Sequence, residues 1–164
     1  MTAALKARPL TPAAFAPFGD VLEVSDGAFI EINQGRCRRF HDLAKLDFAD
    51  GQAGINLFHA EVRAAPYSIE LLERHPLGSQ CFVPMQGSEY IVAVAPDADG
   101  QPGEIQAFLA DANQCVNYHR NTWHAVLTPV SGTGLFAVID RIGQGKNLQE
   151  HWFDTPIAVE LPAR

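Results

Sequence analysis

Two short segments hold the residues of this sequence best suited to chemistry. The first reads Glu73-x-His75-x4-Gln80, and the second ends in two histidines, His119 and His124. Imidazole, carboxylate and amide groups gathered together can bind a divalent cation or transfer protons. We therefore expect Glu73, His75, Gln80 and His124 to meet at one point inside a small barrel.

The spacing of the first segment leaves two interpretations open. Glu73 and His75 are two residues apart, so on a strand they share one face. Gln80 follows a bend at residues 76–78, which resets the alternation of side chains. The segment either contributes to one convergent polar pocket or forms a solvated loop with Gln80 on an exposed edge.

The two histidines of the second segment lie five residues apart. An odd offset on one strand puts side chains on opposite faces, unless a turn at residues 120–121 intervenes. A lone histidine is usually structural. Two histidines beside Trp123 at a strand–turn–strand junction make a functional role for His119 and His124 about as strong a hypothesis as a structural one. His59 and His151 have no such neighbours, and we expect them to be structural.

Arginines form a second group of candidates. Residues 36–41 make a basic cluster in an acidic chain, and its Arg39 could hold a small carboxylate because a guanidinium matches carboxylate geometry. Surface pairing with Glu31 and Asp42 is the slightly favoured alternative. Asp140 and Arg141 end an apolar run, where they form either a structural ion pair or a substrate clamp.

Alternating apolar and polar residues predict that strands position these side chains. Turn residues recur every 8 to 15 positions, and helical periodicity is scarce. Thr11-Pro12 predicts the start of one short helix. Residues 40–46 are ambiguous, 68–72 fit a strand or one helical turn, and the tail with Trp152 is expected to pack on the body. Strands are expected at 21–24, 29–33, 54–63, 80–84, 89–95, 104–109, 115–118, 124–127 and 135–140.

This pattern indicates an all-β fold, either a sandwich or a barrel. We predict one domain over residues 1–164, built as an antiparallel jelly roll with an open mouth for a ligand.

The composition argues against several classes of function. A formal net charge of −7 makes nucleic acid or an anionic membrane an unfavourable partner. Three dispersed cysteines without a CxxC pair indicate a reducing compartment. The N-terminal residues have no apolar core of a signal peptide, and residues 91–95, the longest clean apolar run, cannot span a bilayer. We expect a cytoplasmic protein. Nucleotide-binding loops and the GxSxG and HExxH motifs are absent from the sequence.

Six segments of the chain carry distinctive residue strings: Ile32–Gly35, Arg39–Ala44, Glu73–Gln80, Phe82–Met85, Val116–His124 and Ile139–Arg141. Together they closely resemble the ureidoglycolate lyase family. The resemblance implies a cupin-like β-barrel with one or two short helices, usually assembled as a homodimer. It also implies a bacterial enzyme of allantoin and purine degradation that splits (S)-ureidoglycolate into glyoxylate and urea, with nickel the metal usually named. Older naming called such proteins ureidoglycolate hydrolases.

The chain departs from the broader cupin pattern at its ligand positions. Glu73 stands where that pattern has a histidine, and Gln80 stands where it has a carboxylate. His75 and His124 keep the histidine positions. Two imidazoles, one carboxylate and one amide therefore form the implied metal set, which is weaker than a set with two carboxylates.

The implied substrate is a carbinolamine, and its cleavage requires a base at the hydroxyl and an acid at the departing nitrogen. We expect Glu73 or His75 to be the base and His119 or His124 to be the acid.

Substrate binding requires a cation for the carboxylate and partners for the ureido group. We expect Arg39 and Arg141 to hold the carboxylate, with Asp140 beside Arg141, and Asn33 and Gln80 to bind the ureido group.

Two other functions stay open. A metal-dependent cupin oxygenase or isomerase could use Glu73, His75 and His124 as a facial set of ligands. A sensor that binds a small organic acid is the third hypothesis, although the chain has no helix-turn-helix pattern to transmit a signal.

Overall fold

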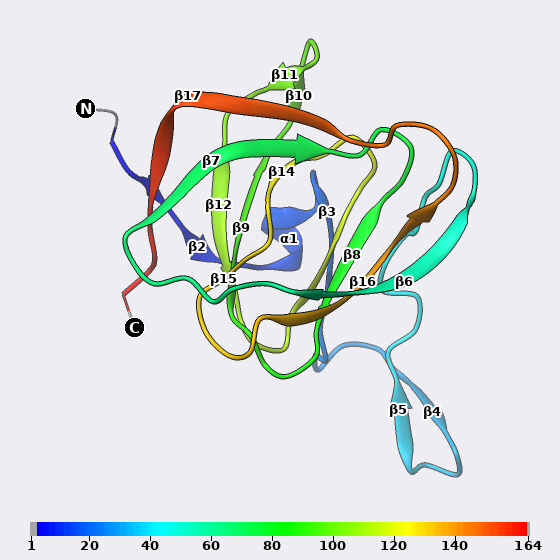
Figure 1. Ribbon diagram of the computed structural model, residues 1–164. Helices are drawn as coiled ribbons and strands as arrows, with labels where there is room; N and C mark the ends of the chain where they lie inside the picture. The colour runs from blue at the N-terminus through cyan, green and yellow to red at the C-terminus, as the bar shows by residue number, and fades with distance from the viewer. Residues whose placement is uncertain (1–2, 164) are drawn as a thin grey trace.

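Two β-sheets of unequal size curve around each other to form an almost closed barrel (Figure 1). The computed structural model describes residues 3–163. The larger sheet has the order β1-β17-β7-β14-β9-β12-β2, and β15 also pairs with β9. Its strands are β1 (Leu5–Lys6), β17 (Gln149–Glu160), β7 (Tyr67–Arg74), β14 (Trp123–Ala125), β9 (Tyr90–Ala95), β12 (Gln106–Ala110), β2 (Arg8–Pro9) and β15 (Thr128–Pro129).

The smaller sheet has the order β3-β13-β8-β16-β6, so β6 is an edge strand. This architecture confirms the predicted all-β, cupin-like barrel. Two further hairpins lie outside the sheets: β4 (Ile30–Ile32) with β5 (Cys37–Arg39), and β10 (Asp97–Ala98) with β11 (Gln101–Pro102). The strands of the smaller sheet are β3 (Gly19–Leu22), β13 (Cys115–Tyr118), β8 (Gln80–Pro84), β16 (Leu135–Ile142) and β6 (Gln52–His59).

The predicted helix is a single turn, α1 (Pro12–Phe15), in which the Thr11 hydroxyl accepts a hydrogen bond from the Ala14 N–H at 3.2 Å. No helix within residues 3–163 has the length and apolar character needed to cross a membrane. The ambiguous segment at 68–72 lies in β7, while 40–46 contains no strand. The tail forms the long strand β17 against β7, which the sequence did not predict because its apolar residues do not alternate regularly.

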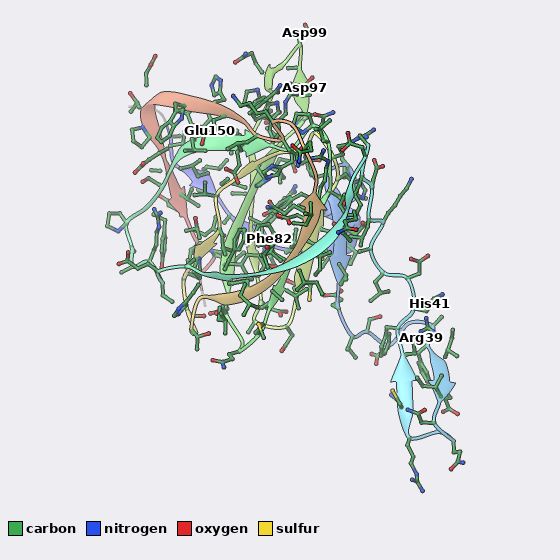
Figure 2. All side chains as sticks on the ribbon, turned by 45° about the vertical axis from the view of Figure 1, so that its right-hand side comes forward. Arg39, His41, Phe82, Asp97, Asp99 and Glu150 are labelled. Atoms are coloured by element: carbon green, nitrogen blue, oxygen red, sulfur yellow. The ribbon has the colours of Figure 1, made fainter. Side chains whose placement is uncertain are left out.

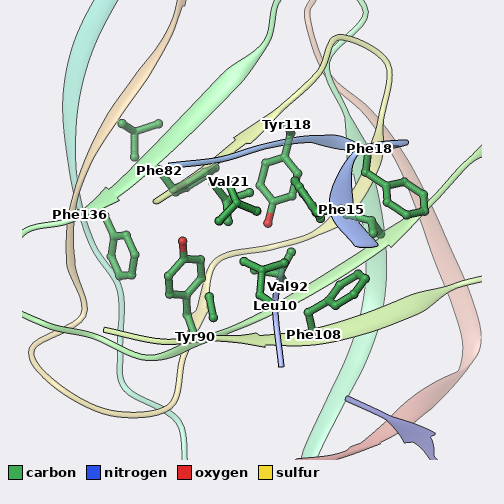
Figure 3. Close-up of a cluster of buried hydrophobic side chains, with 14 residues drawn as sticks. Leu10, Phe15, Phe18, Val21, Phe82, Tyr90, Val92, Phe108, Tyr118 and Phe136 are labelled. Atoms are coloured by element: carbon green, nitrogen blue, oxygen red, sulfur yellow. The ribbon is translucent and has the colours of Figure 1, made fainter. Parts of the chain in front are cut away.

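The apolar strand β9 runs through the centre of the protein with all six residues buried. Alternate side chains enter two different cores. Tyr90, Val92 and Val94 join the aromatic core between the sheets, which Figure 3 shows in close-up. Ile91, Ala93 and Ala95 join a second core that the two terminal segments help to cover. Each fully buried Val or Ile stabilises the fold by roughly 1.5–3 kcal/mol relative to an exposed one.

The strand register places the polar residues of the barrel interior opposite one another. His124 on β14 lies opposite Glu73 on β7, and Tyr118 on β13 lies opposite Gln80 on β8. Residues directly opposite on antiparallel strands point to the same face. The fold therefore brings together side chains that are 51 and 38 positions apart in the sequence.

The hairpin β4–β5 projects away from the barrel (Figures 1 and 2). Its two strands pair only with each other. We call residues 24–43 the arm. None of these residues is buried, and only Ile32 and Phe40 are half-buried.

Candidate active site

Three side chains with metal-binding or acid–base chemistry converge at one end of β7. Glu73 is the residue before the last one of that strand, and His75 follows the strand directly. His124 lies opposite Glu73 on the neighbouring strand β14. One ligand atom from each lies within 4.8 Å of the others. The His75 and His124 ring centroids are 5.3 Å apart, and Glu73 Oε1 is 3.8 Å from His75 Nε2, too long for a hydrogen bond. We call these three residues the Glu73 cluster.

Backbone carbonyls orient both imidazoles. His75 Nδ1 lies 2.7 Å from the Asn147 carbonyl oxygen, and His124 Nδ1 lies 3.1 Å from that of Ala125. A carbonyl only accepts, so each Nδ1 carries a proton, and in the neutral ring Nε2 then keeps a free lone pair. Both Nε2 atoms are buried without a hydrogen-bond partner among the described residues. The rings are therefore held as ligand-ready acceptors.

A short hydrogen-bonded chain orients Gln80 in the same interior. Its Nε2 donates to Asp140 Oδ2 at 3.3 Å, while Asp140 Oδ1 accepts from Asn56 Nδ2 at 2.8 Å. Gln80 Oε1 is buried and has no partner within residues 3–163. Asp140 thus fixes which end of the amide is free, and the free end is the oxygen.

Burial controls the charge state of the Glu73 cluster. Burial lowers the pKa of His124 to about 3, with a further contribution from nearby His75, so the His124 imidazole is neutral at physiological pH. The Tyr118 ring stacks on it at 4.1 Å and an interplanar angle of 9°. Burial also raises the pKa of Glu73, and Glu150 adds to this effect while His75 opposes it. The cluster therefore combines the neutral His124 imidazole with a carboxyl group that readily takes a proton.

These donors fit a divalent transition metal. Buried polar atoms are almost always hydrogen-bonded, because leaving one unsatisfied costs about 1–3 kcal/mol. Here two imidazole nitrogens and one amide oxygen lack partners beside a carboxylate. Nitrogen and oxygen donors of this kind bind first-row divalent ions. A cation bound between Glu73, His75 and His124 would satisfy both imidazole nitrogens at once.

A cavity of about 380 Å³ opens beside the cluster, with Glu73 in its lining. Most of its wall is apolar, which strengthens electrostatic interactions inside it. His59, which the sequence gave no reason to select, also lines this cavity because the end of β6 borders the mouth. The other lining residues are Phe58, Ala60, Phe82, Val126 and Leu127.

His119 lies outside the Glu73 cluster. Tyr118, the last residue of β13, points into the barrel. His119 follows it directly, so its side chain points to the opposite face. There His119 Nε2 lies 3.0 Å from Asp20 Oδ2. The structure gives His119 a partner of its own, and its catalytic role stays a prediction.

Arg141 also occupies the outer face, one residue after the inward-pointing Asp140. Its guanidinium binds Asp50, with Nε 2.6 Å from Asp50 Oδ1, and donates to the Gln144 carbonyl. Only 2% of the Arg141 side chain is exposed. Arg141 therefore ties two loops together, and its predicted contact with a substrate carboxylate stays untested.

Asn33 and Arg39 lie on the arm, remote from the cluster of their own chain. Asn33 adopts a positive φ of 54° in the hairpin turn, and both residues are exposed. Figure 2 shows Phe82 inside the barrel and Arg39 on the projecting hairpin. One chain alone does not bring the predicted substrate-binding set together.

The fold and the site define a class: cupin-like barrel proteins with a histidine–carboxylate centre at an interior cavity. Comparison with known proteins is more specific. The family model described as ureidoglycolate lyase matches residues 2–160. Ureidoglycolate lyase from Rhodobacter capsulatus is 52% identical over 157 residues, 95% of this chain and 98% of the relative. The chain belongs to the ureidoglycolate lyase family.

Other relatives agree over nearly the full length. Ureidoglycolate lyase from Chelativorans sp. is 45% identical over 160 residues, 96% of this chain and 97% of the relative. Ureidoglycolate lyase 2 from Rhizobium meliloti is 46% identical over 158 residues, 95% of this chain and 97% of the relative. The predicted family is confirmed.

Proposed function

We propose that this protein cleaves (S)-ureidoglycolate into glyoxylate and urea, a step of allantoin and purine degradation. The names of its relatives support the reaction. The single structural observation that carries the proposal is the Glu73 cluster, in which Glu73 lines the cavity and both histidine Nε2 atoms are buried without a partner among the described residues.

The reaction moves one proton and breaks one bond. The hydroxyl loses its proton, the C–N electron pair leaves with the urea nitrogen, and that nitrogen gains a proton while the carbonyl of glyoxylate forms. No water is consumed. The reaction therefore requires positioned proton acceptors and donors, which typically contribute about 10²–10⁴-fold each.

Glu73 is the best candidate for the base. Its carboxyl lines the cavity, and its raised pKa makes it a better proton acceptor than an ordinary glutamate. His75 and His124 are the candidates for ligands, since each Nε2 lacks a partner among the described residues. To act as the acid, either imidazole would first have to take a proton on Nε2, and Glu73 can supply the proton that it accepted from the hydroxyl. The partner of His119 on the outer face gives no support to the acid role, so we assign that role to the cluster.

We further propose that Glu73, His75, Gln80 and His124 hold a divalent metal, with nickel suggested by the family resemblance. When bound, such an ion supplies Lewis acidity at a substrate oxygen. The free oxygen of Gln80, oriented by Asp140, completes the donor set. The same side chains would orient the substrate, and the apolar lining of the adjacent cavity would limit the access of water.

A cytoplasmic location and a homodimeric assembly are also part of this proposal. Three free cysteines are consistent with a reducing compartment. The family resemblance suggests the dimer.

The test is product analysis with racemic ureidoglycolate, with and without a chelator. We expect glyoxylate and urea in equal amounts, from one enantiomer only. Release of ammonia and carbon dioxide instead of urea would replace the lyase by a hydrolase. Binding without any turnover would favour a sensor.

A further inference from the structure

The arm carries apolar side chains that one chain leaves in solvent. Phe29 is 39% exposed, Ile30 48% and Leu43 39%. Phe29 packs against Phe40 at 6.0 Å, and the Arg38 guanidinium lies 4.8 Å from the Phe29 ring, so the hairpin has only local contacts. An isolated two-stranded hairpin is marginally stable in water. Packing against a further surface would therefore stabilise the arm.

The barrel offers a matching apolar surface on strand β6. Ile55 is 77% exposed and Leu57 65%, and both point away from the barrel interior. This strand is the edge of the smaller sheet, so one side of its backbone is also free to pair. The same strand borders the cavity through Phe58 and His59. A segment docked on β6 would therefore lie beside the cavity mouth.

The cavity of a single chain lacks a cation for the substrate carboxylate. Arg74, next to Glu73, binds Asp97 at 2.6 Å on the outside of the barrel, and Arg141 binds Asp50. The Arg39 side chain on the arm is exposed and makes no hydrogen bond or ion pair with the residues that the structure describes. With His41 it lines a hollow of about 230 Å³ on the arm.

We propose that the arm of one copy docks on β6 of a second copy, and that Arg39 there binds the carboxylate of the substrate in the second copy's cavity. Charge favours this partner, because three arginines lie within residues 36–39 of a chain whose net charge is −7. The arm and β6 are joined by a short segment, so a two-fold axis beside β6 places each arm on the other barrel. The substrate part of this inference rests on the proposed function.

Paired variants separate a contribution in trans from one in cis. Arg39→Ala and Glu73→Gln chains, carrying different affinity tags, are co-expressed and the heterodimer is isolated by tandem purification. Each variant homodimer is expected to lose activity, with kcat/KM at least about tenfold below wild type. The heterodimer has one complete site if the arm acts in trans, so about half of the wild-type kcat/KM returns. No recovery would overturn the proposal.

A reciprocal heterodimer guards against misfolding of a variant. The double variant Arg39→Ala/Glu73→Gln paired with wild type has no complete site if the arm acts in trans, and one complete site if it acts in cis. We expect an inactive pair, and half activity would overturn the proposal. Asp26→Asn, at an exposed position of the same arm, is the matched control and should keep wild-type kcat/KM.

A measurement of the oligomeric state tests the docking of the arm independently of activity. Leu57→Asp should convert a dimer to a monomer in sedimentation velocity, because it charges the docking surface. A wild-type protein that sediments as a monomer would overturn the arm docking whatever its substrate proves to be. Absence of ureidoglycolate cleavage by a wild-type dimer would instead remove the proposed function and leave the assembly standing.

Discussion

Two histidine–carboxylate pairs lie on opposite faces of the barrel wall, and they differ in what surrounds them. On the outer face, His119 Nε2 is 3.0 Å from Asp20 Oδ2, and the same carboxylate oxygen accepts hydrogen bonds at 2.9 Å from the Lys45 N–H and the Asn117 amide. About a third of each side chain is open to solvent, 38% for His119 and 25% for Asp20. His119 Nε2 and the Asp20 carboxylate therefore both have partners, in a network that connects a loop to a sheet.

On the inner face, His75 and Glu73 are 3.8 Å apart and less exposed, at 16% and 19%. The Nε2 atoms of His75 and His124 have no partner among the described residues. The same residue types are therefore structural where their polar atoms are satisfied, and prepared for a ligand where they are not. The contrast separates the candidate histidines more sharply than their spacing in the sequence does.

The largest expected effect is a loss of catalysis when residues of the inner cluster are replaced, but not when residues of the outer pair are. Glu73→Gln and His124→Ala should lower kcat by about 10²–10⁴-fold, because each removes a group that carries a proton or a ligand bond. Glyoxylate release measures this directly, with circular dichroism to confirm folding. His119→Ala is the matched control and should lose less than about tenfold. Equal losses in His119→Ala and His124→Ala would erase the distinction between the two pairs.

Metal binding should also depend on the inner cluster and not on the outer pair of His119 and Asp20. Isothermal titration of chelator-treated protein with Ni²⁺ should show one site per chain in wild type and at least about tenfold weaker binding in His75→Ala. Asp20→Asn removes a carboxylate from the outer pair and should leave the affinity unchanged. Identical affinities in all three proteins would mean that the inner cluster is not the metal site.

A smaller effect is expected from the residue that orients Gln80. Asp140→Asn keeps the shape of the side chain but replaces one acceptor oxygen by a donor, so the Gln80 amide loses its fixed orientation. We expect about a tenfold loss of kcat/KM. Asp154→Asn, at an exposed position on β17, is the control. Wild-type activity in Asp140→Asn would show that Gln80 needs no such support.

The smallest effect concerns stability at the outer pair. Burial alone would raise the pKa of Asp20, but hydrogen bonds from Asn117, Lys45 and His119 outweigh it and lower the pKa. The ionised carboxylate therefore stabilises the fold above the unfolded-state pKa, and this contribution disappears as the pH falls through the lower folded-state value. Asp20→Asn should cost about 0.5–1 kcal/mol at neutral pH, since solvent screens the pair.

Urea unfolding from neutral to acidic pH checks this prediction. The difference in the free energy of unfolding between wild type and Asp20→Asn should shrink as the pH falls below 3.8, the ordinary pKa of an aspartate. A difference that is constant across the range would mean that Asp20 acts through packing and not through its charge.

The sequence by itself determined the class of fold, the family and the residues of the inner cluster. Apolar alternation such as that of residues 89–95 indicates strands because side chains on a strand alternate between faces. The segment from Glu73 to Gln80 carries donor atoms at a spacing typical of a cupin-like site. Local patterns of this kind depend on neighbouring residues, so they are visible without coordinates.

Only the tertiary structure decided which candidates share a space. Long-range register put His124 opposite Glu73, and strand parity sent His119 and Arg141 to the outer face. The arm holds Arg39 outside its own barrel, and the tail became the strand β17. These outcomes depend on pairing between distant segments, and on whether each buried polar atom finds a partner there, which no local pattern encodes.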